Sequence, residues 1–219
     1  MKRSLWWSCL SLAACLDAEA DFPRAIETPC AELSCPTAMV AVVDPSDVTR
    51  TVGGLSVNGS CICVDAYEAS RGPGDVAVSA PGVRPWVGLN FDQATAACEA
   101  AGKRLCTGAE WTAACTGIPA FPFPYGESLD PKACNTTSTV ALTGAYPGCE
   151  GGAAGLFDLS GNVAEWAAEP TRGCDLELGC ATFGGGWDAP EAELACGYRA
   201  GFGRDQGHAN VGFRCCRSP

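Results

Sequence analysis

Apolar residues recur at helical spacing in two stretches near the middle of the chain. In the first stretch the repeating positions are Ala94, Ala97, Cys98 and Ala101. Residues at this spacing lie on one face of a helix. Asn90 or Asp92 can cap the start of the helix, and Gly102 can end it. We therefore predict a helix between residues 90 and 102 with one apolar face.

A second helix is predicted almost at once, between residues 107 and 117. Thr107 precedes it and Glu110 follows three positions later, a capping box in which each side chain can satisfy a backbone N–H of the first turn. Trp111, Ala114 and Cys115 then share one face of the helix. We expect both helices to pack their apolar faces against a sheet.

Strand-like segments on either side of the helices are short. Alternating side chains predict a strand within Ser60–Ser70, and further strand-like pieces occur at Phe183–Trp187, Tyr198–Arg199 and Val211–Arg214. Ile118–Ala154 has no regular period and is rich in Pro, Gly, Thr and aromatic residues. Irregular segments of this length in a compact domain are commonly functional. The pattern predicts a loop-rich α+β domain.

One stretch fits neither a helix nor a strand. Gly155–Trp166 reads GLFDLSGNVAEW and combines an apolar pair, the two acids Asp158 and Glu165, and a Ser-Gly-Asn corner. Acids at a sharp turn can serve catalysis or bind a metal, and they can equally cap the turn or pair with an arginine. On the residues alone, these interpretations stay open.

The composition is that of a secreted, cross-linked protein. Charged residues make up 18% of the 219 residues, whereas there are 27 glycines and 16 cysteines, a balance typical of loop-rich extracellular domains. The formal net charge is −11. Because an acidic surface repels phosphate backbones and anionic head groups, we expect neither nucleic-acid binding nor polybasic membrane binding.

The first residues predict export and a lipid anchor. Lys2 and Arg3 form a basic start, and Leu5–Ala14 is an apolar run too short to span a bilayer. The run leads into Leu12-Ala13-Ala14-Cys15, which resembles the bacterial lipobox, where cleavage precedes a cysteine that receives the lipid.

The domain organisation follows from this leader. We expect residues 1–14 to be the signal peptide, 15–58 a tether and 59–219 the folded domain. The alternative is an ordinary secretory signal cleaved near Ala18 or Ala20.

The cysteine count agrees with export. Removing Cys9 with the leader and committing Cys15 to lipid leaves 14 of the 16 cysteines, enough for seven disulfides in an oxidising compartment. Metal binding is the rival use of so many thiols. It is the weaker interpretation, because the chain has one histidine, His208, and no paired C-x-x-C motifs of the zinc type. His208 also has no recognisable Ser or Cys partner, which favours a surface loop residue over a general base.

Several disulfides can be proposed from local spacing. Cys174–Cys180 and Cys134–Cys149 would each close a short loop, and Cys30–Cys35 would close a smaller one. Cys215 and Cys216 are neighbours whose side chains would point to opposite faces of an extended chain, so we expect them to bridge to different elements.

Taken in order, several stretches resemble the formylglycine-generating enzyme (sulfatase-modifying factor) family. They are VDAYEAS at 64–70, PWVGLNFDQATAACEAAGKRLCTGAEW at 85–111, FPYG at 123–126, GLFDLSGNVAEW at 155–166, GGGW at 184–187 and GFRCC at 212–216. The resemblance spans about residues 60–216. It implies a C-type-lectin-like α+β fold with little regular secondary structure and, in this chain, disulfide bracing.

The resemblance also implies a calcium site. The matching ligands are the side chains of Asp158 and Glu165 and the carbonyl groups of Gly161 and Val163. Two carboxylates and turn carbonyls form the hard oxygen shell that Ca²⁺ takes in proteins. We therefore expect structural calcium at this corner.

The copper chemistry of the family is not expected here. Members that generate formylglycine bind copper(I) through two cysteines that lie between a Gly-Gly-Ser-aromatic turn and a Tyr-Arg pair. In this chain the turn ends Gly185-Gly186-Trp187, and Ala189 stands where the first cysteine would be. The second would fall near Ala195, where Cys196 is the nearest thiol and the one weak catalytic candidate. We expect Cys196 to be bridged to one of the two adjacent cysteines near the C-terminus, so no catalytic residue is assigned.

Two functional hypotheses follow. The first is a lipid-anchored, calcium-stabilised module in the bacterial cell envelope that binds a protein or glycan without catalysis, with Glu68, Arg199 and Arg214 as structural ion-pair members. The alternative is a copper-dependent formylglycine-generating oxidase, or a related oxygenase, acting on a protein substrate. We expect the lipid to be the sole membrane contact; secretion is the alternative location.

Overall fold

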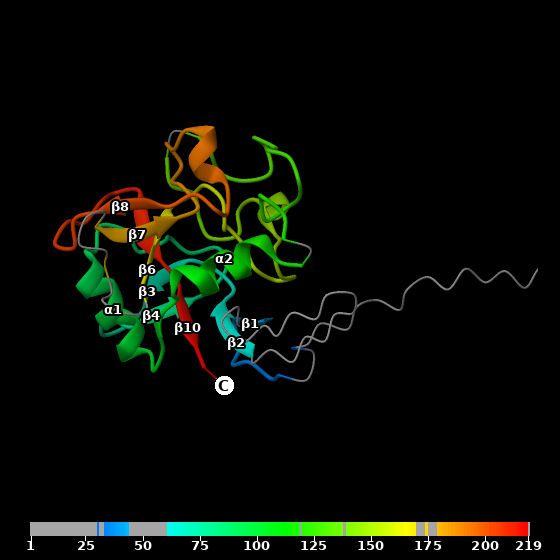
Figure 1. The fold of residues 1–219 in the computed structure, drawn as a ribbon. Coiled ribbons are helices and arrows are strands. Elements are labelled where there is room, and N and C mark those ends of the chain that lie inside the picture. Colours follow the sequence, from blue (N-terminus) through cyan, green and yellow to red (C-terminus); the bar gives the residue numbers. More distant parts are fainter. Residues whose placement is uncertain are drawn as a thin grey trace, which may run out of the picture.

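The computed structural model describes residues 30, 33–43, 61–118, 120–137, 139–169, 174 and 179–218. The expected signal peptide and Cys15 lie outside these residues. The described residues form an α+β arrangement with two α-helices and short strands in three sheets. In Figure 1 the C-terminus and β1, β2 and β10 lie at one end of the molecule, and the irregular loops gather at the other.

Both predicted helices are confirmed. Helix α1 (Phe91–Ala100) is capped by Asn90, whose side chain accepts the Gln93 N–H at 2.9 Å. Helix α2 (Gly108–Thr116) begins with the predicted capping box, in which Thr107 accepts the Glu110 N–H and Glu110 accepts the Thr107 N–H at 2.8 Å. These local hydrogen bonds explain why both helices begin where the sequence indicates.

The first sheet has the strand order β1-β2-β10-β5, and all its pairs are antiparallel. Its strands are β1 (Met39–Val43), β2 (Cys61–Asp65), β10 (Cys215–Arg217) and β5 (Arg104–Leu105). Strand β1 lies inside residues 15–58, which we expected to be a tether. It pairs with β2 along its whole length, so part of that segment belongs to the packed domain.

The other two sheets hold the strands of the central and C-terminal parts. Strands β3 (Ala69–Arg71) and β4 (Ala77–Ser79) form a hairpin, and the last sheet has the order β8-β7-β6-β9. Its strands are β8 (Ala200–Phe202), β7 (Cys180–Phe183), β6 (Ala164–Ala167) and β9 (Val211–Phe213). Strands β6 and β9 are parallel, and the remaining pairs are antiparallel.

Three strand predictions need correction, one of which is Tyr198–Arg199, because the strand there, β8, begins only at Ala200. The expected strand within Ser60–Ser70 is two strands, β2 and β3, because the chain changes direction after Asp65. The expected strand at Phe183–Trp187 begins earlier, at Cys180, and ends at Phe183. Gly184 and Gly185 then adopt φ values of +83° and +64°, which favour glycine and turn the chain out of the sheet.

The core has two main clusters: one packs α2 against β1, β2 and the last sheet, and the other packs α1 against the last sheet. Trp111 of α2 stacks on Phe183 of β7 with ring centroids 5.3 Å apart, and Trp166 of β6 is equally buried. In the described part of Ile118–Ala154, the one helical or strand element is a 3₁₀ turn, η2 (Pro147–Cys149). The lack of a regular apolar period in this segment had predicted such irregular structure. No helix among the described residues has the length and apolar character needed to cross a membrane.

Seven disulfides brace the described residues, as the cysteine count predicted. They are Cys30–Cys61, Cys35–Cys63, Cys98–Cys215, Cys106–Cys216, Cys115–Cys196, Cys134–Cys149 and Cys174–Cys180. The two short-loop pairs are confirmed. Cys215 and Cys216 bridge to different elements, as expected, because successive side chains of β10 point to opposite faces.

Two pairing predictions are wrong. Cys30 and Cys35 do not bond each other, because the pairing of β1 with β2 brings their segment alongside Cys61 and Cys63. Cys196 does not bond either of the adjacent cysteines. Its partner is Cys115 on α2, which ties the loop after the glycine turn to the helix.

Candidate functional site

The Gly155–Trp166 stretch forms a sharp, buried corner before β6. Asp158, Gly161 and Asn162 have φ values of +60°, +73° and +56°, so the chain turns through left-handed conformations that cost non-glycine residues energy. The Gly161 N–H donates to the Gly184 carbonyl at 2.8 Å, which joins the corner to the glycine turn. The corner is thus built into the fold and is not a free loop.

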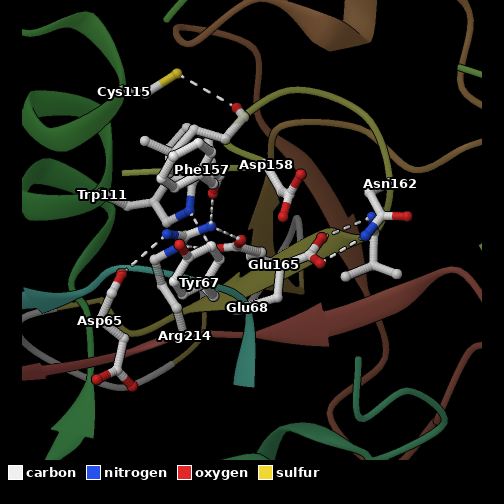
Figure 2. A network of polar contacts seen from close by, with 12 residues as sticks. Asp65, Tyr67, Glu68, Trp111, Cys115, Phe157, Asp158, Asn162, Glu165 and Arg214 are labelled. Atoms are coloured by element: carbon white, nitrogen blue, oxygen red, sulfur yellow. Dashed lines mark hydrogen bonds and ion pairs between the residues drawn. The ribbon is translucent and has the colours of Figure 1, made fainter. Parts of the chain in front are cut away.

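Asn162 is the residue that holds this corner together, and the sequence analysis missed it. Its side-chain oxygen accepts the Ala141 N–H at 2.8 Å and the Asn135 amide at 2.9 Å, while its own amide donates to Glu68 Oε2 at 2.6 Å. Glu68 Oε1 accepts the Val163 N–H at 3.0 Å. Glu68 therefore accepts hydrogen bonds from the corner, as Figure 2 shows. It forms no ion pair with another described residue, so the ion-pair role expected for it is wrong. The Ser-Gly-Asn motif was the available signal.

A buried ion pair lies next to this corner. The Arg214 guanidinium donates to both oxygens of Glu165, at 2.7 Å from Nε and 2.6 Å from Nη2, and Trp111 Nε1 donates to Glu165 Oε2 at 2.6 Å. The Arg214 guanidinium also donates to the carbonyls of Asp65 and Phe157. The ion-pair role predicted for Arg214 is confirmed (Figure 2).

The charges around this pair do not balance. Glu68, Asp158 and Glu165 are all buried, and Arg214 is the basic group that faces them. Burial raises the pKa of Asp158 to about 6. Burial, followed by the charges of Asp158 and Glu165, raises the pKa of Glu68 well above its ordinary value. Surplus negative charge in a buried place favours either protonation or a bound cation.

The carboxylates among the predicted calcium ligands differ in how many of their oxygen atoms remain available to a cation. Asp158 Oδ2 accepts the Gly144 N–H at 2.6 Å, which leaves Oδ1 uncommitted. Glu165 Oε2 accepts from both Arg214 and Trp111, whereas Oε1 accepts one hydrogen bond and keeps a lone pair. Among the residues that the structure describes, no three His, Cys, Asp or Glu side chains are grouped as a metal centre. Any cation here would therefore depend on Asp158, on Glu165 Oε1 and on the carbonyls of Gly161 and Val163.

The position of the family's copper cysteines holds no thiol pair. Ala189 follows the glycine turn, and Cys196 is fully buried in its disulfide with Cys115. A disulfide offers no thiolate. His208 packs against the Phe202 ring at 4.3 Å between centroids, and its Nε2 is buried without a hydrogen-bond partner among the described residues.

A small cavity opens beside Ala189 and is bordered by residues of β6, β7 and β8. Its volume is about 120 Å³. It is lined by Ala164, Thr182, Gly185, Gly186, Asp188, Ala189, Pro190, Glu193, Tyr198, Ala200, Phe202 and Asn210. The cavity therefore borders Ala189, the position of the family's first copper cysteine, and presents carboxylates, hydroxyls and an amide.

Comparison with known families and sequences supports the resemblance. Residues 56–219 match the model of the sulfatase-modifying factor enzyme 1-like domain. The chain is 28% identical over 187 residues to the formylglycine-generating enzyme of Thermomonospora curvata, covering 70% of this chain and 61% of that protein. It is 31% identical over 150 residues to the inactive C-alpha-formylglycine-generating enzyme 2 of Bos taurus, covering 60% of this chain and 49% of that protein.

A third relative is longer. The chain is 30% identical over 151 residues to serine/threonine-protein kinase pkn1 of Chlamydia pneumoniae, covering 61% of this chain and 24% of that protein. The match thus spans about a quarter of the length of this relative.

Solved structures share the fold. Treponema denticola variable protein 1 aligns with a TM-score of 0.57 at 16% identity over 83% of this chain and 95% of its own. CarF aligns with a TM-score of 0.59 at 14% identity over 83% of this chain and 98% of its own. At such identities the likeness establishes the fold alone, which is the formylglycine-generating-enzyme fold expected from the sequence.

Proposed function

The chain belongs to the sulfatase-modifying factor enzyme 1-like domain family, and from this we propose that it is a non-catalytic binding module of that family. One observation carries the proposal. Ala189 replaces the first cysteine of the copper pair, and Cys196, the nearest thiol to the second position, is consumed in a buried disulfide with Cys115. Copper(I) selects soft thiolate ligands, and this place offers none.

The relatives include proteins of both kinds. One is described as a formylglycine-generating enzyme and another as an inactive one. The alternative function, a copper-dependent formylglycine-generating oxidase or related oxygenase, would require a second thiol pair in this chain. All cysteines among the described residues are bridged, which favours the binding module.

Intact mass of the denatured, unreduced protein, with and without iodoacetamide, tests the proposal. We expect no adduct on residues 30–219 and no stoichiometric uptake of copper(I), because each thiol there is oxidised. The same sample after reduction is the control and should carry fourteen adducts in that region, two for each of the seven disulfides. Two reactive thiols including Cys196, together with bound copper(I), would overturn the module in favour of the oxidase.

We also propose export to the bacterial cell envelope with a lipid on Cys15. The seven disulfides support an oxidising location, and the lipobox-like run before Cys15 supports the anchor. The mass measurement reads this directly, because processing removes residues 1–14 and adds acyl chains to the new N-terminus. A mass that corresponds to a mature chain starting after Ala18 or Ala20 would indicate secretion without a lipid anchor.

Calcium binding at the corner is the third part of the proposal, with Asp158 as the main ligand. The surplus buried negative charge and the uncommitted Asp158 Oδ1 support it. At a hundredfold excess over Kd, calcium should stabilise the fold by about 2.7 kcal/mol, a rise in Tm of about 5–10 °C. We expect Asp158→Asn to abolish the rise.

Thermal unfolding with calcium and with a chelator measures this effect. Asp75→Asn is the matched control, because Asp75 is exposed and lies on the β3–β4 hairpin turn; its variant should keep the full rise. An unchanged rise in Asp158→Asn would place the ion elsewhere.

A further inference from the structure

The cavity beside Ala189 has the features of a binding site for a positively charged alkyl chain. We propose that it binds an alkylammonium group, such as the side chain of a lysine or the end of a free polyamine. The inference rests on the proposed binding-module function and names the chemistry of its ligand.

Two carboxylates give the cavity its charge. Asp188 follows the glycine turn, and Glu193 lies on the 3₁₀ helix η3 (Glu191–Leu194). Asp188 Oδ1 accepts from the Asn210 amide at 2.8 Å, and Glu193 Oε1 accepts from the Tyr198 hydroxyl at 3.2 Å. Each carboxylate keeps its second oxygen uncommitted. No lysine or arginine is among the described residues that line the cavity, so nothing there balances the two negative charges.

An unsatisfied hydroxyl points to a ligand independently of the acids. Thr182 of β7 lines the cavity, is 1% exposed, and its Oγ1 has no hydrogen-bond partner among the described residues. A buried hydroxyl without a partner costs about 1–3 kcal/mol. A bound donor that reached this hydroxyl would remove this cost, and the two carboxylates that share the cavity lining select a donor that is also a cation.

The walls of the cavity suit an alkyl chain. Ala189, Pro190 and Phe202 contribute apolar surface, and Tyr198 stands exposed beside them. Gly186 carries no side chain where a Cβ would lie 3.0 Å from the Asn210 carbonyl and 3.1 Å from Asp188 Oδ1. This glycine lets Asp188 and Asn210 approach each other and keeps the cavity open.

An ammonium group matches these acceptors better than the other cations do. It has three donors on one compact charge, and the cavity offers acceptors on Asp188, Glu193 and Thr182. A guanidinium is planar and pairs best with a single carboxylate in a fork. A divalent metal is less suited, because among the described residues no three His, Cys, Asp or Glu side chains are grouped to hold one.

Isothermal titration of the full chain with n-pentylamine tests the proposal, with n-pentanol as the neutral analogue. We expect the amine to bind and n-pentanol to bind at least about tenfold more weakly, because it lacks the charge. Asp188→Asn and Glu193→Gln should each weaken amine binding about tenfold, and Thr182→Val about threefold. Glu99→Gln is the control, because Glu99 is an exposed acid on α1 that does not line the cavity; this variant should leave binding unchanged.

The two sources of the ammonium are separated with two further titrations. A peptide with one internal lysine and free spermidine are compared, each against its acetylated form. Tighter binding of the peptide assigns the cavity to a protein partner, and tighter binding of spermidine assigns it to a free polyamine. Equal binding of pentylamine and pentanol, or no change in Asp188→Asn and Glu193→Gln, would overturn the proposal. These outcomes leave the copper and thiol measurements untouched, so the failure of either proposal is distinguishable from the failure of the other.

Discussion

Replacing Arg214 with methionine is expected to lower the free energy of unfolding by about 3–5 kcal/mol. The guanidinium neutralises Glu165 inside the core through two hydrogen bonds of 2.7 and 2.6 Å, and it satisfies the carbonyls of Asp65 and Phe157. Methionine fills similar space but leaves a buried carboxylate without its partner. Urea denaturation of the variant and the parent protein measures the loss.

A matched control separates burial from charge. Arg71 also pairs with an aspartate, but both side chains are largely exposed, at 65% and 64%. Arg71→Met should therefore leave the stability nearly unchanged. In the double variant Arg214→Met, Glu165→Leu the loss should be smaller than for Arg214→Met alone, because the Glu165 carboxylate no longer remains buried without its partner. A loss below about 1 kcal/mol in Arg214→Met would show that the pair does not secure the core.

Removing the two disulfides of β10 together is expected to cost more than the sum of removing each alone. Cys98–Cys215 and Cys106–Cys216 close loops with sequence separations of 117 and 110 residues. Cys98 and Cys106 lie near each other in the sequence, and Cys215 and Cys216 are adjacent. When one of the two bonds is removed, the other therefore still closes almost the same loop. Changing one pair to alanine should cost about 2.5 kcal/mol, and changing both about 7 kcal/mol, which exceeds twice the single loss.

The two short-range bridges provide the control for this non-additivity. Cys134–Cys149 and Cys174–Cys180 have separations of 15 and 6 residues and no shared loop. Removing both should give the sum of the single effects to within about 0.5 kcal/mol. Chemical denaturation of the four single-bridge and two double-bridge variants gives all the values. Simple additivity for the β10 pair would contradict the shared-loop account.

Local signals in the sequence predicted local structure well. The capping box of α2 depends on two residues three positions apart. The start of α2 at Gly108 could therefore be predicted from the sequence alone. The bridges Cys134–Cys149 and Cys174–Cys180 were predictable for the same reason, because short loops bring their ends together in most conformations.

Long-range pairings could not be read in this way. Nothing near Met39–Val43 indicates that this strand joins β2, since the partner is set by register across an intervening segment. The same holds for Cys115–Cys196, whose ends lie on a helix and a distant loop. The family resemblance supplied the fold but not these contacts.

The corner and the cavity differ in how much the sequence revealed. Asp158 and Glu165 stood out as acids at a turn, yet the pairing of Glu165 with Arg214 depends on β9, which pairs in parallel with β6 and ends one residue before Arg214. The cavity brings together Thr182, Asp188 and Asn210 from a strand, a turn and a loop. No spacing rule connects these positions, because only tertiary packing places them around one space.

The two disulfides at the start of the domain decide how it would bear a mechanical load. Cys30 and Cys35 precede β1 and are bonded to Cys61 and Cys63 of β2. A pull on the N-terminal segment would therefore pass through sulfur–sulfur bonds straight into β2, bypassing the hydrogen bonds of β1. The domain would resist peeling from that end, while the loops at its opposite end (Figure 1) stayed free of tension.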